Sequence, residues 1–254
     1  MSSPGAVVVE VKGLVAGYDG RPALDAVSFR VRGGERVAVL GPNGGGKTTL
    51  FRVLLDEVPV GAGTVEVAAR CATVPQTERS RLDFPVSALD VVLMGTIAGL
   101  AWWRRPGRDE RGRGLEALEM VGLRELADQS FGALSGGQRQ RVLVARTLVQ
   151  DAGVLLLDEP FTGMDAASSE RLTMLLDELS AAGRALLIAT HDVEQARAWD
   201  LVLCLNRCQI AFGPPAETLT RPVLEATYGG AIVPLPRAEG GEDLAIVPPH
   251  HHEH

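Results

Sequence analysis

Apolar positions along the chain follow two different periods, and each period predicts a different kind of element. In the first third, short alternating or apolar runs bounded by turn residues predict β-strands. After about residue 131, continuous apolar runs alternate with stretches of helical periodicity, which predicts a parallel sheet covered by helices on both faces. The predicted strands are 7–11, 27–31, 37–40, 64–67 and 72–74 (the last two as a strand pair), then 154–157, 185–189, 201–205 and 209–212.

A helical segment interrupts this succession of strands. Ser87 and Asp90 have capping-box spacing and precede the apolar run 91–94, which predicts a helix start. Apolar positions continue at 115–123, after a break rich in arginine and glycine. We therefore expect an α-helical subdomain, at about 77–134, inserted into one α/β domain.

The remaining pattern sets the limits of that domain. Further helices are predicted after the 37–40 strand, through about Leu55, and at 138–149, 166–182 and 193–199. Past Gly213 the chain becomes proline-rich, and no further helix or strand is predicted. The domain is taken as 1–228, with 229–254 as a tail that is histidine-rich at its end.

Composition narrows the class of protein. The 254 residues are 46% hydrophobic, enough for a sizeable core, and the net charge of −7 argues against a nucleic-acid-binding surface. Three cysteines without a Cys-x-x-Cys pair fit a reducing cytosol. The N-terminus lacks the features of a signal peptide, and no stretch approaches the roughly 18 apolar residues of a membrane span. Any membrane role is therefore expected to come through a partner.

A glycine-rich segment follows the predicted strand 37–40 and precedes a predicted helix. It matches Gly-x4-Gly-Lys-Ser/Thr, a phosphate-binding loop in which backbone N–H groups and a helix N-terminus face the phosphate oxygens. Lys47 is expected to bridge the β- and γ-phosphates, and the Thr48 hydroxyl to bind Mg²⁺. The alternative is a glycine-rich turn with an incidental Lys-Thr. The segment consists of Gly41, Pro42, Asn43, Gly44, Gly45, Gly46, Lys47, Thr48 and Thr49.

Two adjacent carboxylates end the predicted strand 154–157. Open α/β sheets gather their ligands at strand ends, and Asp158 is suited to hold Mg²⁺ there. Glu159 is suited to orient and deprotonate an attacking water. A surface Asp-Glu pair is the alternative interpretation.

A second glycine-rich helix start, Leu134-Ser135-Gly136-Gly137-Gln138, lies between these two motifs. One such loop is enough to hold a triphosphate. Two nucleotide-contacting loops on one chain make sense if each completes the site of a neighbouring copy. A P-loop kinase would leave this second loop unexplained.

With these three motifs in this order, residues 7–212 resemble the ATP-binding subunit of an ATP-binding cassette (ABC) transporter. The resemblance implies an α/β P-loop NTPase fold: a RecA-like core, an N-terminal antiparallel β-subdomain and an inserted α-helical subdomain. It also implies a head-to-tail dimer, of two copies or of paired ABC subunits, that sandwiches two ATP molecules with Mg²⁺.

Individual roles follow from the resemblance. Tyr18 would stack on adenine, Gln76 would contact Mg²⁺ and the water, and His191 would touch the γ-phosphate. Asp165 matches the loop that couples the two sites. Ser135 and Gly137 would contact the γ-phosphate bound by the other subunit, with Gly136 and Gln138 in the same signature. A turn tyrosine and a core histidine remain the alternatives for Tyr18 and His191.

Two positions depart from the family pattern. Gly45 stands where the family often has Ala, Ser or Cys, and Thr48 replaces the commoner Ser. Both keep the backbone cradle and the hydroxyl group, so ATP binding is still expected.

The stretches 74–76, 82–86, 90–95 and 159–165 resemble the zinc/manganese/iron group of importers. This implies a separate integral-membrane permease, with the chain at the cytoplasmic face of the membrane, and an extracytoplasmic metal-binding protein acting indirectly. Phe84 and Trp102-Trp103 would help receive a permease helix, or else pack in a core. An iron chelate as cargo, or a soluble ABC ATPase acting on DNA or ribosomes, are the alternatives.

The C-terminal residues form a histidine cluster. Imidazoles and a carboxylate could bind a transition metal there. A short tail without a role explains the cluster equally well. Its residues are His250, His251, His252, Glu253 and His254.

Overall fold

The computed structural model describes residues 5–74, 85–97, 105–229, 232–236 and 242–246, the last two ranges by their backbone. The chain forms two compact units. The first is built mainly from Ala68–Leu186, and the second from Val9–Val31, Glu35–Val67 and the chain after Leu186. Strand β7 (Ala185–Thr190) passes from the first unit into the second.

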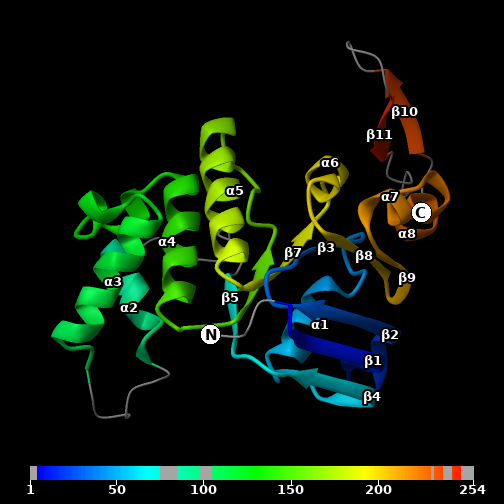
Figure 1. The fold of residues 1–254 in the computed structure, drawn as a ribbon, viewed down its shortest axis with the longest axis horizontal. Helices are drawn as coiled ribbons and strands as arrows, with labels where there is room; N and C mark the ends of the chain where they lie inside the picture. The colour runs from blue at the N-terminus through cyan, green and yellow to red at the C-terminus, as the bar shows by residue number, and fades with distance from the viewer. Residues whose placement is uncertain (1–4, 75–84, 98–104, 230–231, 237–241, 247–254) are drawn as a thin grey trace. The chain divides into compact units, whose positions relative to one another are not determined.

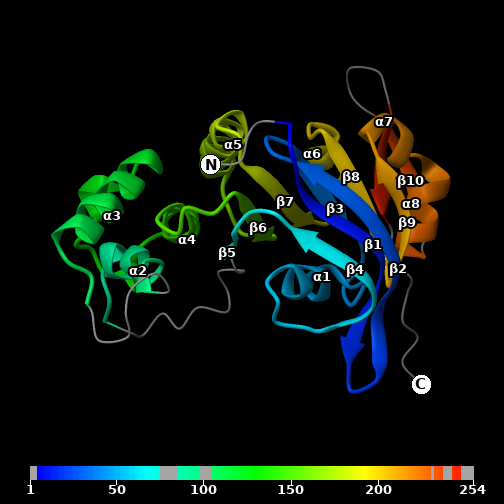
Figure 2. The same ribbon diagram turned by 60° about the horizontal axis from the view of Figure 1, so that its bottom comes forward.

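The second unit contains a mixed sheet with the strand order β4-β1-β2-β9-β8-β3-β7. β1 and β4 pair antiparallel, β3 and β8 pair parallel, and β8 and β9 pair antiparallel (Figure 2). The antiparallel N-terminal subdomain is therefore confirmed. The strands are β1 (Val7–Tyr18), β2 (Arg21–Arg32), β3 (Arg36–Leu40), β4 (Val60–Val67), β8 (Leu201–Asn206) and β9 (Cys208–Gly213).

The first unit joins short parallel strands to a group of helices. β5 (Cys71–Val74) pairs parallel with β6 (Val154–Asp158), and β7 lies next to β6. β4 and β5, predicted as a strand pair, are not partners, because β4 pairs with β1 instead. The helices are α2 (Ala88–Met94), α3 (Arg108–Met120), α4 (Gly136–Leu148) and α5 (Ala166–Ala181), with short 3-10 turns at Arg124–Leu126 and Phe131–Ala133.

Helices α2 and α3 lie in the predicted helical insertion and pack against each other and against α4, which follows it (Figure 1). The capping box at the start of α2 is present: the Ser87 hydroxyl accepts from the Asp90 N–H (3.1 Å), and the Asp90 carboxylate accepts from the Ser87 N–H (2.9 Å). A Cβ at Gly114 would lie 2.9 Å from Leu89 Cδ1. The glycine therefore lets α3 approach α2 closely.

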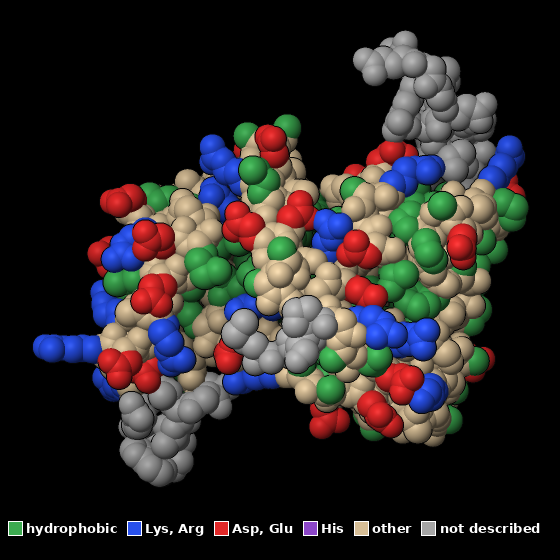
Figure 3. All heavy atoms as spheres, viewed as in Figure 1, with side chains coloured by type: hydrophobic (Ala, Val, Ile, Leu, Met, Phe, Trp, Pro, Cys, Tyr) green, Lys and Arg blue, Asp and Glu red, His purple; other side chains and the backbone are tan. Residues whose placement is uncertain are grey.

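Buried strands form the core of each unit. All side chains of β7 are buried, as are 154–157 of β6, which confirms the prediction from their continuous apolar runs. Among the described residues, no helix combines the length and apolar character needed to cross a membrane. On the face shown in Figure 3, acidic and basic side chains are interspersed.

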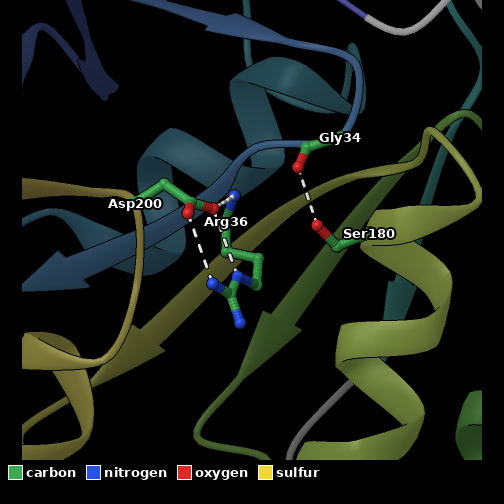
Figure 4. A network of polar contacts seen from close by, with 4 residues as sticks. All are labelled: Gly34, Arg36, Ser180 and Asp200. Atoms are coloured by element: carbon green, nitrogen blue, oxygen red, sulfur yellow. Dashed lines mark hydrogen bonds and ion pairs between the residues drawn. The ribbon is translucent and has the colours of Figure 1, made fainter.

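Polar contacts hold the strand ends (Figure 4). In the second unit, the Arg36 guanidinium group donates to both oxygens of Asp200, from Nε at 3.1 Å and from Nη2 at 3.2 Å. Burial raises the pKa of Asp200, but the hydrogen bonds and the charge of Arg36 outweigh burial and leave the pKa below its usual value. In the first unit, Ser180 Oγ donates to the Gly34 carbonyl at 2.7 Å.

The prediction of no elements past Gly213 was wrong. Helices α7 (Pro215–Thr218) and α8 (Arg221–Tyr228) follow, and then the antiparallel pair β10 (Ile232–Pro236) and β11 (Glu242–Ile246). Pro215 and Pro222 lie in the first turns of their helices, where the missing N–H leaves no intrahelical bond unmade. Proline-rich sequence here marks helix starts and not the end of structure.

Candidate functional site

The phosphate-binding loop lies in the second unit, between β3 and α1 (Lys47–Leu54). Gly44 and Gly46 have φ values of 75° and 100°, a left-handed conformation that favours glycine. A Cβ at Gly46 would lie 2.5 Å from Leu24 Cδ2 and 3.0 Å from the Ala23 carbonyl oxygen. Both the backbone conformation and the space around it therefore require glycine directly before α1.

Lys47 carries the positive charge of this loop. Its side chain is 7% exposed, and its Nζ donates to the carbonyls of Gly41 (2.5 Å) and Pro42 (3.1 Å). The loop thus curls around its own ammonium group at the N-terminus of a helix. Backbone N–H groups, a helix dipole and a lysine at one place make an anion site. Thr48 follows in the helix and is half-buried.

The departure at Gly45 coincides with a close contact. A Cβ at this position would lie 2.9 Å from the Pro42 oxygen and 3.1 Å from the Leu205 oxygen. The Gly45 N–H donates to the Pro42 carbonyl at 3.0 Å, and the Gly45 carbonyl accepts from the Arg207 N–H at 2.9 Å. In this chain, glycine lets the loop close tightly on the turn that follows β8.

A pocket of about 780 Å³ lies beside the loop, within the range of ligand sites. Tyr18 and the loop residue Gly44 both line this pocket. Tyr18 is 42% exposed, and Arg52 Nη1 donates to its hydroxyl at 3.3 Å. Two arginines of this pocket were missed, because they belong to no phosphate-binding motif. The lining residues are Tyr18, Asp19, Arg21, Pro22, Ala23, Gly44 and Arg207.

The carboxylate pair lies in the first unit, at the end of β6. Asp158 is the last residue of the strand, and both carboxylates are half-buried. Glu159 has a φ of 49°, a conformation that is uncommon outside glycine and is often found at functional sites. Thr162 Oγ1 donates to Glu159 Oε2 at 3.2 Å. The turn after β6 thereby orients the Glu159 carboxylate.

Asp165 ends this turn and caps α5. Its Oδ1 accepts from the Ser168 N–H at 2.7 Å. Hydrogen bonds from Ser168 hold the pKa of Asp165 below its usual value. Asp165 is exposed, and its position is set by the helix that it caps.

The signature Ser135–Gln138 forms the start of α4 in the same unit. Ser135 is the N-cap: its Oγ accepts from the Gln138 N–H (3.2 Å), and Gln138 Oε1 accepts from the Ser135 N–H (2.8 Å). The prediction of a second helix start is confirmed. A Cβ at Gly137 would lie 2.6 Å from Ser168 Oγ, so this glycine packs closely against the start of α5. The helix start that carries the signature therefore packs directly against the start of α5, which Asp165 caps.

The remaining predicted residues are His191 and several positions outside the described ranges. His191 is exposed and follows β7, just before α6 (Val193–Arg197), in the unit that holds the phosphate loop. Gln76, Phe84, Trp102-Trp103 and the histidine cluster 250–254 lie outside the described residues. Among the residues that are described, no group of three or more His, Cys, Asp or Glu side chains could hold a metal ion.

Magnesium fits the donors that the motifs supply. Mg²⁺ prefers oxygen ligands, usually keeps several waters, and is bound through few protein groups together with substrate phosphates. The Thr48 hydroxyl, beside a buried lysine, and the Asp158 carboxylate, at a strand end, are donors of this kind.

Comparison with known proteins identifies relatives along most of the chain. The family model for ABC transporters matches residues 24–162. The zinc transport system ATP-binding protein TroB of Treponema pallidum is 40% identical over 236 residues, which cover 89% of each chain. The manganese transport system ATP-binding protein MntB of Bacillus subtilis is 37% identical over 233 residues, 88% of this chain and 93% of that protein.

Solved structures give the same result. A structure described as a metal-chelate type ABC transporter in an inward-facing conformation has a TM-score of 0.84 and 29% identity, and covers 97% of this chain and 99% of its own. A dimeric bacterial ABC transporter cassette has a TM-score of 0.70 and 25% identity, with coverage of 82% and 98%. The chain therefore belongs to the ABC transporter family, as one of its ATP-hydrolysing cassettes.

Proposed function

We propose that this chain hydrolyses ATP to power the import of a transition-metal ion, manganese, zinc or iron, through a separate membrane permease. The buried Lys47 inside its glycine loop is the observation that carries the ATPase part. The names of TroB and MntB support the cargo class. The chain then acts at the cytoplasmic face of the membrane, and an extracytoplasmic binding protein delivers the metal to the permease.

Binding of ATP begins at the phosphate loop. Lys47 and the loop N–H groups, from Gly41 to Thr49, hold the β- and γ-phosphates, and Tyr18 stacks on adenine, a contact that any base can make. Thr48, Asp158 and Gln76 would hold Mg²⁺, directly or through its water shell. When bound, the ion neutralises charge on the phosphates.

Hydrolysis needs a positioned water. Glu159 has the role of orienting and deprotonating it, and the hydrogen bond from Thr162 gives this carboxylate one orientation. His191 contacts the γ-phosphate from the loop after β7. Holding the reacting groups in place supplies much of the rate acceleration in phosphoryl transfer.

The second half of the site comes from another cassette. The Ser135 hydroxyl accepts from its own helix and can still donate its proton to a γ-phosphate. Gly137 adds the N–H groups of a helix start. ATP thus bridges two subunits, and the closing of this dimer moves the permease. Close packing of Gly137 on Ser168 would pass that contact to Asp165 and the Glu159 turn.

The test of the ATPase role is Glu159→Gln, with Glu116→Gln, at an exposed position of helix α3, as the matched control. We expect ATP turnover to fall by at least about 100-fold while ATP stays bound and holds a dimer. ATPase assays and light scattering measure the two effects. Undiminished turnover in Glu159→Gln would contradict the assigned role.

Cargo is tested in vesicles that contain the chain and its cognate permease. We expect ATP-dependent uptake of Mn²⁺, Zn²⁺ or iron, and none with Lys47→Ala. An iron chelate is the second candidate, since a structural relative is described as a metal-chelate transporter. Uptake of an intact chelate without uptake of free ions would select that candidate.

A further inference from the structure

We propose that Arg21 and Arg207 form a second phosphate-binding subsite beside Gly44. This subsite binds the part of the phosphate chain of a nucleoside di- or triphosphate that lies nearest the nucleoside. The two arginines line the same pocket as Tyr18 and Gly44. This inference rests on the proposed function of the pocket as the ATP site. It adds two side chains that neither the motifs nor the family resemblance assign.

Arg207 is placed by its backbone. It forms the turn between β8 and β9, with a φ of 62°, and the flanking residues Asn206 and Cys208 pair with each other. Its N–H donates to the Gly45 carbonyl at 2.9 Å, and its carbonyl accepts from the Asp25 N–H at 2.7 Å. The phosphate loop and β2 thus hold this residue from both sides, and Arg207 lines the pocket beside the loop.

Arg21 reaches the same pocket from another element. It is the first residue of β2, directly after the turn at Asp19 and Gly20, where φ is 50° and 73°. Tyr18 ends β1 on the other side of that turn. Tyr18 and Arg21 therefore line the pocket from the two sides of one turn.

The charges of the pocket favour an anion. Among the described residues, neither the Arg21 nor the Arg207 guanidinium group makes a hydrogen bond or an ion pair, and both residues are exposed. Of the described residues that line the pocket, Asp19 alone carries a carboxylate, against these two cations. A guanidinium group matches phosphate oxygens with two parallel hydrogen bonds. A phosphate chain between the two arginines would also relieve their mutual repulsion.

The position of the pocket indicates which part of the nucleotide the two arginines would bind. Lys47 sits inside the loop, where the terminal phosphates bind, and Tyr18 marks the place of the base. Gly44, three residues before Lys47, lines the pocket together with Tyr18 and the two arginines, whereas Lys47 itself does not. The subsite therefore recognises the stretch of phosphate nearer the ribose, and it serves ADP as well as ATP.

The test uses Arg207→Gln, Arg21→Gln and the double variant in the full chain, with Arg30→Gln, at an exposed position of β2, as the control. Affinities for ATP, ADP and adenosine are measured by competition against a fluorescent ATP analogue. We expect each single variant to bind ATP and ADP about 5- to 10-fold more weakly, with adenosine and the control unchanged. The loss shrinks at high salt, because ions screen exposed charges.

Unchanged ATP affinity in Arg207→Gln and Arg21→Gln, with normal binding by the parent, would overturn the subsite alone. A parent chain that binds no ATP would instead overturn the proposed function. Because Arg207 also braces the loop through its backbone, melting temperatures are compared, and Arg207→Lys should recover part of the affinity. If Arg207→Gln does not fold, the test rests on Arg21→Gln. An equal loss of affinity for adenosine and for ATP in Arg21→Gln would also contradict phosphate recognition.

Discussion

The chain contains two glycine-rich helix starts, and they differ in how their polar groups are used. In the phosphate loop, two glycines adopt left-handed conformations, and a buried lysine side chain is enclosed by the loop's own carbonyls. In the signature loop, the helix start is closed by its own serine and glutamine, and no lysine or arginine lies within Ser135–Gln138. Ser135 itself is exposed, whereas Lys47 is buried.

Because of this difference, the phosphate loop can hold an anion by itself, whereas the signature loop can only add contacts to an anion that is already held. A buried cation with loop N–H groups supplies charge and directed donors at once, so the phosphate loop can bind a nucleotide in a single chain. The signature loop offers one hydroxyl proton and a helix end, too little to hold a triphosphate in water alone. In the proposed function it acts on ATP that another subunit has already bound. The predictions below test this division of labour.

The largest effect is expected at Lys47. Lys47→Ala removes the buried charge inside the loop, and ATP affinity of the single chain should fall by at least about 100-fold, or about 2.7 kcal/mol. Calorimetry measures the change. Lys12, the only other lysine of the chain, pairs with Glu10 on β1, so Lys12→Ala serves as control and should bind ATP normally. Equal affinity in the two variants would show that the loop does not depend on its lysine.

Gly137 offers the corresponding change in the signature. Its Cβ would overlap Ser168 Oγ, and overpacking of this kind costs about 1–3 kcal/mol. Gly137→Ala should lower ATP turnover by at least about 10-fold and weaken the ATP-dependent dimer, while the single chain still binds ATP. Gly112→Ala in helix α3 is the control, because it lies outside the signature and its Cβ would meet nothing within 4 Å. Weakened ATP binding by single Gly137→Ala chains would contradict the separation of the two loops.

Ser135 separates the cap from the phosphate contact. Ser135→Ala loses the N-cap and about 1 kcal/mol of stability, whereas Ser135→Asp keeps a cap and places negative charge where a γ-phosphate would bind. We therefore expect Ser135→Asp to unfold near the parent's temperature but to form no ATP-dependent dimer. Thermal unfolding and light scattering give the two readings. A stable dimer in Ser135→Asp would exclude Ser135 from contact with phosphate.

The smallest expected effect is on the free energy of unfolding, when the polar contacts at the strand ends are removed. Asp200→Asn should cost about 1 kcal/mol at pH 7, because Asp200 is partly exposed and its ion pair is screened. The folded pKa of Asp200 lies below its unfolded value near 3.9, so its stabilising contribution is present above that pH and is lost as the pH falls through the folded pKa. Ser180→Ala breaks a neutral contact in the other unit and should cost a similar amount at every pH. Denaturant unfolding from pH 3 to pH 7 compares them, and a constant difference for Asp200→Asn would refute the charge argument.

Local sequence predicted most elements and all three motifs, and its failures have physical causes. The prediction for β1 ended at Val11, because the alternation breaks at Gly13, where the strand has a φ of 58° and its pairing with β4 shifts register. The N-terminal half of β4 was not predicted, because residues 60–63 are exposed and include two glycines. Helix α8 was not predicted, because the proline-rich composition past Gly213 indicated a tail. Pro222 in fact lies in the first turn of this helix, where proline is tolerated.

The sequence alone determined the phosphate loop, the carboxylate pair, the signature and the inserted helices. Each of these is encoded by neighbouring residues whose spacing sets backbone conformation and capping. Only the tertiary structure decided which strands pair and which distant residues share a pocket. Arg207 lies about 160 positions after Gly45 and belongs to no motif, yet its N–H donates to the Gly45 carbonyl and the residue lines the same pocket as Tyr18. Such contacts depend on long-range strand pairing, and no local pattern records them.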